Sequence, residues 1–556
     1  MIRPLLFTFA LLSSLALATP EDTLMMQIPS AIASTEPAQA VVTYDVLPVQ
    51  QLYEGLFLND FGTYTPLLAT SFTQSKDGKV TTFTLRENVQ FHDGSPMTCA
   101  DAEYSLRRTL LVGNETSQAA QIRSNLLGIT SFTPEVQKTF TFDKLAQIVQ
   151  CNEAGQLVLS LDKNVPSLLD SLTQAYIVPQ QILAAGGDWS GTAEDFEAFR
   201  GKDVSDSLLS QQPVGTGAYM FVARDPSLFV LKGFDGYWGG APALTNVIIQ
   251  KVDSDTARVL ALQKGDADIA VIPDRDTLAR LEGSPGVTVY DELPTRDQTP
   301  VILFNQNIQD AKFLPSGQLA ENNMPADFFS DVHVRKAFAA AFDMATFTRD
   351  ALQGKGLPRN TTLPPNNWAD DKRLEPPAYD LKTAEAEFKQ AFGGELWTTG
   401  FTLPLDFVAG SGLSQVVAEI FKQNLEGLNP KFHVEVVTME LSAGNAALLG
   451  GKLPLSALTW GGADPDTVLR GLYSAEGILG TAVNFSDPKL ETMLDQARDA
   501  VGQDARKPLY TSLLRYLNEQ TYAFPLTLPL GFAATSASLN GYEDFNKTNL
   551  FRVLFK

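Results

Sequence analysis

The sequence predicts a mixed α/β protein built from two or three domains. Its 556 residues exceed what one hydrophobic core usually organises. Short segments with the two-residue period of half-buried strands are mixed with amphipathic helices along the whole chain. Neither a short fixed repeat nor a low-complexity tract occurs, which excludes solenoids and propellers. Hydrophobic residues make up 44% of the chain, enough for well-packed cores.

The first segment, residues 1–18, has the pattern of a secretory signal peptide. Arg3 precedes an apolar run from Leu5 to Leu17, and small residues surround a predicted cleavage site after Ala18. The run is too short to span a membrane, and the absence of a cysteine after it provides no lipid anchor. We therefore expect a periplasmic or otherwise extracytoplasmic protein, exported and not membrane-anchored.

The formal net charge of −22 bears on the partners of the chain. An acidic surface repels phosphate backbones and anionic lipids. Nucleic acid is therefore not an expected partner.

The pattern of apolar residues defines a strand and three helices. Residues 79–91 alternate apolar and polar side chains and predict a half-buried strand. Residues 413–428 carry one apolar helical stripe. Ser330 is the predicted N-cap of a helix over the following residues, and Ser486 is the predicted N-cap of another, with Pro488 in its first turn.

Phe91 to Arg108 (FHDGSPMTCADAEYSLRR) concentrates reactive groups but reads as a strand-to-helix connection. Asp93 and Gly94 form a turn signal, while Thr98 and Asp101 have the spacing of a capping box. A general base also needs a positioned nucleophile or water, and the sequence supplies none for His92. We predict a structural role for this stretch.

The chain contains two cysteines, Cys99 and Cys151. In an oxidising compartment they could form a disulfide, which would stabilise the fold by about 4 kcal/mol on the chain-entropy model. Two separate buried thiols are the alternative. The sequence does not decide between them.

Several motifs together resemble the family 5 substrate-binding proteins of ABC transporters, which include the dipeptide- and oligopeptide-binding proteins. The segment LRENVQFHDGSPMTCADAEYSLRR is similar to the family signature. It is preceded by YEGL and followed by VGTGAYMF, YWGGAP, GDADIA, FNQN, RKAF and PPNNW in the family's order. The resemblance covers nearly all of the chain after residue 18.

This resemblance implies a two-lobed, type II periplasmic-binding-protein clamp with an extra third domain. The first lobe would be discontinuous, comprising 19–50, 176–300 and 526–556. The extra domain would span 51–175 and the second lobe 301–525. The chain would cross between the lobes near 301 and near 525, where PLTLPL fits an extended crossing.

The implied function is capture and delivery of a solute. A ligand that touches both lobes stabilises the closed form, which docks on the permease subunits of an ABC transporter. We expect a monomer that binds a peptide or other small solute, makes no chemical change to it and uses no cofactor.

The family's ligand residues transfer only in part. In the peptide binders, a tryptophan and a Gly/Asp loop supply an aspartate for the ligand's amino terminus. Here Trp460 and the glycines Gly461 and Gly462 match, but Ala463 stands where the aspartate of the dipeptide binders would fall. Asp464 either substitutes from a shifted position or only turns the chain.

The family's arginine for the peptide carboxylate is also missing. The corresponding segment, DFVAGSGLSQVV, contains no basic residue. Both departures favour an oligopeptide, held by its backbone, over a dipeptide. An oligosaccharide stacked on Trp460 is an alternative ligand. Tyr44, Asp45 and Asn305 are further predicted contacts, whereas Trp238 and Trp368 are predicted to pack.

Two other functions are disfavoured. A secreted hydrolase would need a nucleophile, yet no G-x-S-x-G elbow occurs and the three histidines lie in segments that read as ordinary structure. Some members of the family bind nickel complexes, but these scattered histidines do not have metal-ligand spacing. No metal site is predicted.

Overall fold

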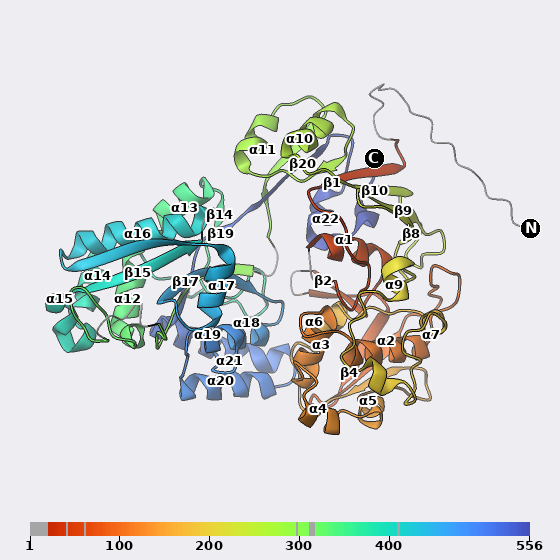
Figure 1. The fold of residues 1–556 in the computed structure, drawn as a ribbon, viewed down its shortest axis with the longest axis horizontal. Helices are drawn as coiled ribbons and strands as arrows, with labels where there is room; N and C mark the ends of the chain where they lie inside the picture. Colours follow the sequence, from red (N-terminus) through yellow and green to blue (C-terminus); the bar gives the residue numbers. More distant parts are fainter. Residues whose placement is uncertain (1–19, 41–42, 61–62, 296–297, 311–316, 409–411) are drawn as a thin grey trace, which may run out of the picture.

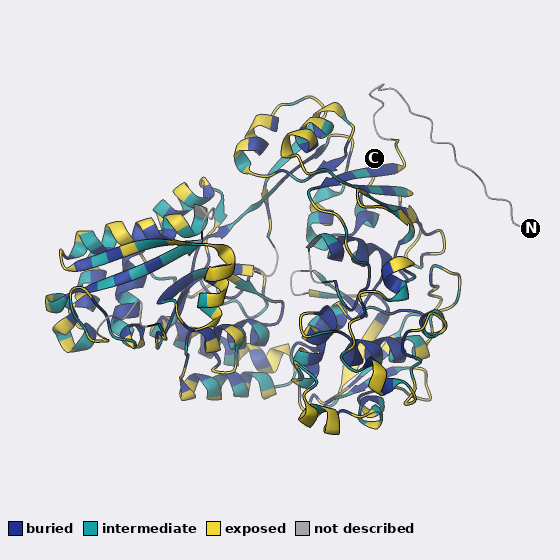
Figure 2. Cartoon of the chain, in the orientation of Figure 1, coloured by how far each residue is buried: buried dark blue, intermediate teal, exposed yellow. Residues whose placement is uncertain are grey.

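The computed structural model describes residues 20–556 apart from five short segments, 41–42, 61–62, 296–297, 311–316 and 409–411. The predicted signal peptide, 1–18, lies outside the described residues. Figure 1 shows two bodies joined by extended chain at one end. In Figure 2 the strands of both bodies are largely buried, while many helices expose one face.

The first body contains a seven-stranded mixed sheet in the order β12-β20-β11-β1-β10-β9-β8. The central strand β1 pairs in parallel with β10 and with β11. The strands come from the beginning, the middle and the end of the chain, within the ranges predicted for the first lobe: β1 (Thr23–Ile28), β8 (Tyr219–Arg224), β9 (Leu228–Gly233), β10 (Asn246–Lys251), β11 (Ile269–Ala270), β12 (Val287–Leu293) and β20 (Gly531–Ser536).

A second sheet in the same body belongs to the segment predicted as the extra domain. Its order is β4-β5-β7-β6, and β5 covers the first half of the strand predicted over 79–91. Helices α2 and α3 also belong to this segment. The bounds are β4 (Ala69–Gln74), β5 (Val80–Leu85), β6 (Val149–Cys151), β7 (Leu157–Ser160), α2 (Cys99–Leu111) and α3 (Gln118–Leu127).

One hydrophobic core runs through both parts of this body. It continues from Leu24 in β1 to Phe83 in β5 and Leu106 in α2. A buried ion-pair network crosses the same boundary, because the Arg108 guanidinium contacts Glu36 at 2.9 Å and Asp188 at 2.7 Å. We infer that the extra domain and the first lobe move as one unit. The domain limits stay a prediction.

The VGTG motif has a steric explanation. Gly215 and Gly217 pack against the backbone at the end of helix α1 (Thr43–Leu52). A Cβ atom at either position would lie 2.1 Å from a carbonyl oxygen, that of Leu52 or of Gln51. Only glycine allows the two backbones to approach this closely.

The second body contains the sheet β17-β13-β18 and the parallel pair β15-β16, with two hydrophobic clusters around them. The amphipathic helix predicted over 413–428 is confirmed as α16. Bounds of the principal elements are β13 (Gln298–Phe304), β15 (Phe401–Val408), β16 (Phe432–Met439), β17 (Leu455–Gly461), β18 (Ala523–Pro525), α12 (Val332–Ala341), α16 (Gly412–Leu428), α18 (Pro465–Tyr473), α20 (Pro488–Asp499) and α21 (Gln503–Gln520).

Both helix caps predicted in this body are wrong by one residue. The N-cap of α12 is Asp331 instead of Ser330, and that of α20 is Asp487 instead of Ser486. The two aspartates accept hydrogen bonds from the second or third backbone N–H of their helices. Aspartate caps as well as serine does and adds a negative charge at the positive end of the helix.

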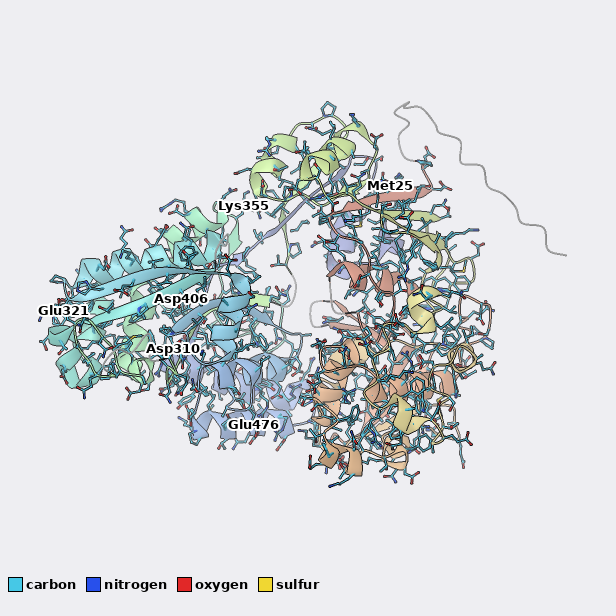
Figure 3. All side chains as sticks on the ribbon, in the orientation of Figure 1. Met25, Asp310, Glu321, Lys355, Asp406 and Glu476 are labelled. Atoms are coloured by element: carbon cyan, nitrogen blue, oxygen red, sulfur yellow. A yellow bond between two sulfur atoms is a disulfide. The ribbon has the colours of Figure 1, made fainter. Side chains whose placement is uncertain are left out.

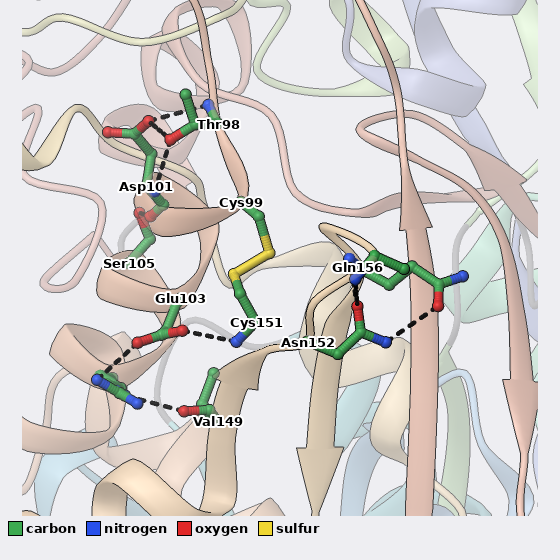
Figure 4. Close-up of a disulfide and its surroundings, with 11 residues drawn as sticks. Thr98, Cys99, Asp101, Glu103, Ser105, Val149, Cys151, Asn152 and Gln156 are labelled. Atoms are coloured by element: carbon green, nitrogen blue, oxygen red, sulfur yellow. Dashed lines mark hydrogen bonds and ion pairs between the residues drawn. A yellow bond between two sulfur atoms is a disulfide. The ribbon is translucent and has the colours of Figure 1, made fainter.

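The stretch from Phe91 to Arg108 has the structural role predicted for it. Thr98 and Asp101 form a complete capping box at the start of α2. Cys99, the first residue of that helix, forms a disulfide with Cys151 in β6, as Figure 4 shows. The disulfide therefore ties α2 to the edge of the β4-β5-β7-β6 sheet.

His92 connects this stretch to the VGTG motif. Its Nδ1 accepts a hydrogen bond from the Gly215 N–H at 3.2 Å, so its Nε2 donates to the Gly217 carbonyl at 3.0 Å. Burial lowers the pKa of His92 to about 4, against an ordinary value near 6.5. The ring is therefore neutral at pH 7 and both its nitrogens are occupied by backbone groups.

Candidate ligand-binding site

Two chain crossings join the bodies. Strand β12 of the first body ends at Leu293, and β13 of the second begins at Gln298. The return crossing lies between Pro525, which ends β18, and Gly531, which begins β20. The second crossing is where PLTLPL predicts it. The first comes a few residues before the predicted boundary at 301, because Thr299 and its neighbours already pair with β17.

Polar contacts reinforce the crossings. The ammonium group of Lys355, labelled in Figure 3, lies 2.9 Å from Asp291 and 2.8 Å from Glu292 at the end of β12. Hydrogen bonds to Glu292 and Asp291 raise the pKa of Lys355. The Arg275 guanidinium donates to the Leu530 carbonyl at 2.6 Å. A side chain of the second body thus contacts the first crossing, and a side chain of the first body contacts the second.

The bodies meet a second time, far from the crossings. The amide of Asn164 in the first body donates to the Arg498 carbonyl at 2.8 Å and to the Ala500 carbonyl at 3.4 Å. These carbonyls belong to the carboxyl end of α20, which Figure 1 places beside the first body. A cavity of about 220 Å³ lies next to this contact, with walls from both bodies.

Trp460, Gly461 and Gly462 lie where β17 ends. This strand pairs with β13 on one side and is an edge strand of its sheet. The three residues are half-buried. The indole N–H of Trp460 donates to the Val468 carbonyl at 3.1 Å, and its ring packs against Gly471, where a Cβ would lie 2.4 Å from it. Trp460 therefore already contacts helix α18.

Asp464 has a structural role at the start of helix α18, the second of the two readings that the sequence left open for it. It is the N-cap of α18 and accepts a hydrogen bond from the Asp466 N–H at 2.8 Å. Its carboxylate also receives two hydrogen bonds from the Arg506 guanidinium, at 2.8 and 3.0 Å. The carboxylate thus accepts three hydrogen bonds within the protein, and only 3% of the residue is exposed.

The side chain of Asn305 is also used in hydrogen bonds within the second body. It is fully buried, and its amide donates to the carbonyls of Gly451 and Leu453, both at 2.9 Å. Its side-chain oxygen accepts from the Asn307 N–H at 3.0 Å. The residue fixes the end of β13 against the start of β17.

The two predicted contacts at the start of α1, Tyr44 and Asp45, differ in their surroundings. Asp45 is buried and accepts a hydrogen bond from the Ala33 N–H at 2.7 Å, so it orders the loop after β1. Tyr44 is half-buried against the core of the first body. Of the seven predicted contacts, Tyr44, Trp460, Gly461 and Gly462 keep exposed surface, and the structure brings only the last three together.

Comparison with known proteins identifies the family. The pattern of the bacterial extracellular solute-binding proteins, family 5 Middle, matches residues 63–479. The chain belongs to this family.

Relatives and solved structures agree with the assignment. The chain is 24% identical to heme-binding protein A of Haemophilus influenzae, over 89% of this chain and 84% of that protein. It is 23% identical to di/tripeptide-binding protein 2 of Pseudomonas aeruginosa, over 99% of each. The unliganded open form of the murein tripeptide-binding protein MppA covers 97% of this chain and 98% of its own, with a TM-score of 0.73 and 22% identity.

Family 5 is a transport family, not an enzyme family. Its members bind small ligands such as peptides outside the cytoplasm and work with ABC transporter permeases. Two findings on the described part of this chain are relevant. No helix there is long and apolar enough to cross a membrane, and no three histidine, cysteine, aspartate or glutamate side chains lie together as metal ligands would.

The segment in which the resemblance predicts a carboxylate-binding arginine, DFVAGSGLSQVV, has no basic residue. The end of β15 and the start of α16 line a pocket of about 100 Å³ that is mainly apolar. Asp406, labelled in Figure 3, is the charged residue in its lining.

Of the residues around the cavity between the bodies, the sequence pointed to Asp464 as a candidate contact and missed a binding role for the others. Trp368, predicted to pack, does pack on Tyr510 but also lines this cavity. Trp238 packs as predicted, with Arg86 on its ring and its N–H donating to Glu54. The cavity is lined by Tyr64, Phe72, Gln74, Thr81, Asn164, Val165, Pro166, Leu168, Leu169, Trp368, Asp464, Ala500, Gly502, Gln503 and Arg506.

Proposed function

We propose that this protein captures a peptide between its two bodies and delivers it to an ABC transporter permease. The two crossings and the second contact at Asn164 support a clamp, because closure about two short crossings can bring the same surfaces together repeatedly. A ligand that contacts both bodies shifts the population toward the closed form.

An oligopeptide fits this site better than a dipeptide. A dipeptide is held mainly by its two charged ends, and the residues that would pair with them are missing. Asp464 is occupied by Arg506, and Asp406 stands in the segment of the carboxylate-binding arginine. Neither position offers the charge that a free dipeptide needs.

The observation that carries the proposal is the free edge of β17. Among the strands of the described residues it pairs only with β13, and Thr459 to Gly462 keep exposed surface. An extended peptide can add to such an edge through main-chain hydrogen bonds, which do not depend on its side chains or its ends. In this binding mode the affinity depends on the length of the peptide more than on the charges of its two ends.

Calorimetry with matched peptides tests this mode. We expect a pentapeptide whose amino end is acetylated and whose carboxyl end is amidated, so that neither end is charged, to bind at least about tenfold more tightly than a dipeptide with charged ends. In an added strand every second backbone N–H points toward β17. N-methylation of those nitrogens should weaken binding, whereas N-methylation of the nitrogens between them should not. Equal affinity for the dipeptide, or indifference to methylation, would contradict the proposal. Native mass spectrometry of the purified protein would reveal a heme, sugar or metal ligand instead.

A further inference from the structure

The cavity between the bodies is lined by hydrogen-bond donors that have no partner within the described chain. The Oγ1 of Thr81 and the Nε of Arg506 are buried and make no hydrogen bond there. Thr81 is 1% exposed and Arg506 is 6% exposed, so bulk water does not reach them freely. A buried donor without a partner costs about 1–3 kcal/mol. Both residues line the cavity, one from each body.

The start of helix α21 adds further donors to the same cavity. Gly502 is its N-cap and provides no side chain to cap the first turn. Gly502 and Gln503 both line the cavity. The unpaired N–H groups of a helix start, and the partial positive charge that they carry, favour an anion.

The remaining wall is apolar and aromatic. Phe72, a residue that is 42% exposed, lines the cavity from the first body together with Leu168 and Leu169. Trp368 lines it from the second, with the Arg506 guanidinium 5.1 Å from its ring centre. This combination suits a group with an apolar body and an acceptor at its end.

The charged residues in the cavity wall indicate which charge the bound group should carry. Asp464 is the acid among the lining residues, and its carboxylate is already paired with Arg506. An ammonium group would find no free acid and would face the start of α21. A carboxylate would find three kinds of donor: a hydroxyl, a guanidinium N–H and backbone N–H groups.

We propose that this cavity binds a carboxylate together with the apolar side chain next to it, such as those of an apolar carboxyl-terminal residue of the captured peptide. The inference rests on the proposed function. It names a site for the carboxylate of the ligand in a chain that lacks the arginine implied by the family resemblance. Asp464 follows the end of β17 by three residues, within about 10 Å of extended chain, so a peptide added to that edge can reach the cavity.

Occupancy of the cavity also couples to closure. Asn164 and Ala500, which form the contact between the bodies, belong to its lining. The cavity has this shape only when that contact is made. A group bound in it therefore stabilises the closed arrangement.

Three small probes test the assignment on the full-length protein. N-acetylphenylalanine has a carboxylate, N-acetylphenylalaninamide is neutral, and phenethylamine is a cation. Titration followed by NMR should show the carboxylate binding at least about fivefold more tightly than the amide. The amine should bind most weakly. An amide or amine that binds as well as the carboxylate would overturn the proposal.

A matched pair of variants locates the site. Thr81→Val removes the hydroxyl and keeps the side-chain shape, and it should weaken the carboxylate probe about tenfold. Thr82→Val changes the neighbouring residue of β5, which faces the other side, and should leave binding unchanged. Melting curves of both variants establish that they are folded. Wild-type affinity in Thr81→Val would refute the site.

The pentapeptide with a free carboxyl end separates this inference from the proposed function. If it binds the wild type and Thr81→Val equally, capture stands and the cavity assignment fails. If no peptide binds the wild type, the proposed function itself fails. Loss of affinity in Thr81→Val alone supports both.

Discussion

His92 shows how a reactive residue can be committed to structure. Both ring nitrogens are bonded to the backbone of the VGTG motif, and burial lowers the pKa of the imidazole to about 4. In the unfolded chain the same group takes up a proton below about pH 6.5. The folded state does not, so protons favour unfolding between these two values.

Stability should therefore fall as the pH drops from about 6.5 toward 4, with about 2 kcal/mol of that loss due to His92. His92→Gln should remove this part of the pH dependence, although it lowers stability at pH 7. Urea unfolding at pH 7.5, 6, 5 and 4.5 measures the difference. His433→Gln, at a side chain that is 44% exposed, is the control. Parallel profiles for the wild type and His92→Gln would contradict the account.

For single residues of the candidate site, the sequence indicates which residue types to look for but not which of them are already bonded within the protein. The sequence indicates Trp460 and the glycines after it, and these lie together at the edge of β17. It could not show that Asp464 is occupied, because its partner Arg506 is 42 residues further along the chain. Asn305 illustrates the same limit, since its hydrogen bonds to Gly451 and Leu453 depend on how two distant strands meet.

Among the elements, helix α2 is the one whose start was best predicted. The capping box of Thr98 and Asp101 is a local pattern, and local patterns are visible in sequence. The disulfide between Cys99 and Cys151 was left open, because the pairing depends on α2 packing beside β6. The caps of α12 and α20 were misplaced because serine and aspartate are neighbours there and both can cap.

The disulfide should contribute strongly to the stability of this element pair. Closing a loop of 52 residues stabilises the fold by about 4 kcal/mol on the chain-entropy model. We expect dithiothreitol to lower the melting temperature of the wild type and to leave the double variant Cys99→Ala/Cys151→Ala unchanged. A melting temperature of the wild type that is insensitive to the reductant would show that the thiols are not paired.

At the scale of the whole molecule, the class of fold was accessible from motif order, while the arrangement of the bodies was not. The sequence resemblance implies an extra third domain, and the structure packs the segment predicted for it on the first lobe through one core and the buried Arg108 network. The cavity beside Asn164 is lined by residues between 64 and 169 of the first body and between 368 and 506 of the second. No local pattern indicates that they meet.

Asn164 should act as a closure contact. Its amide satisfies two carbonyls at the carboxyl end of α20, across the boundary between the bodies. Asn164→Ala should shift the ligand-free protein toward open forms and weaken peptide binding about threefold to tenfold, while unfolding in urea changes little. Single-molecule distance measurements between labels on the two bodies would show the shift. An unchanged distance distribution would contradict it.

Closure on a captured ligand is the central claim, and small-angle X-ray scattering with and without a saturating oligopeptide tests it most directly. The account predicts a smaller radius of gyration with peptide, a smaller contraction in Asn164→Ala, and recovery of the peptide intact. Scattering curves that stay identical while calorimetry shows the site to be filled, or recovery of a cleaved peptide, would contradict it.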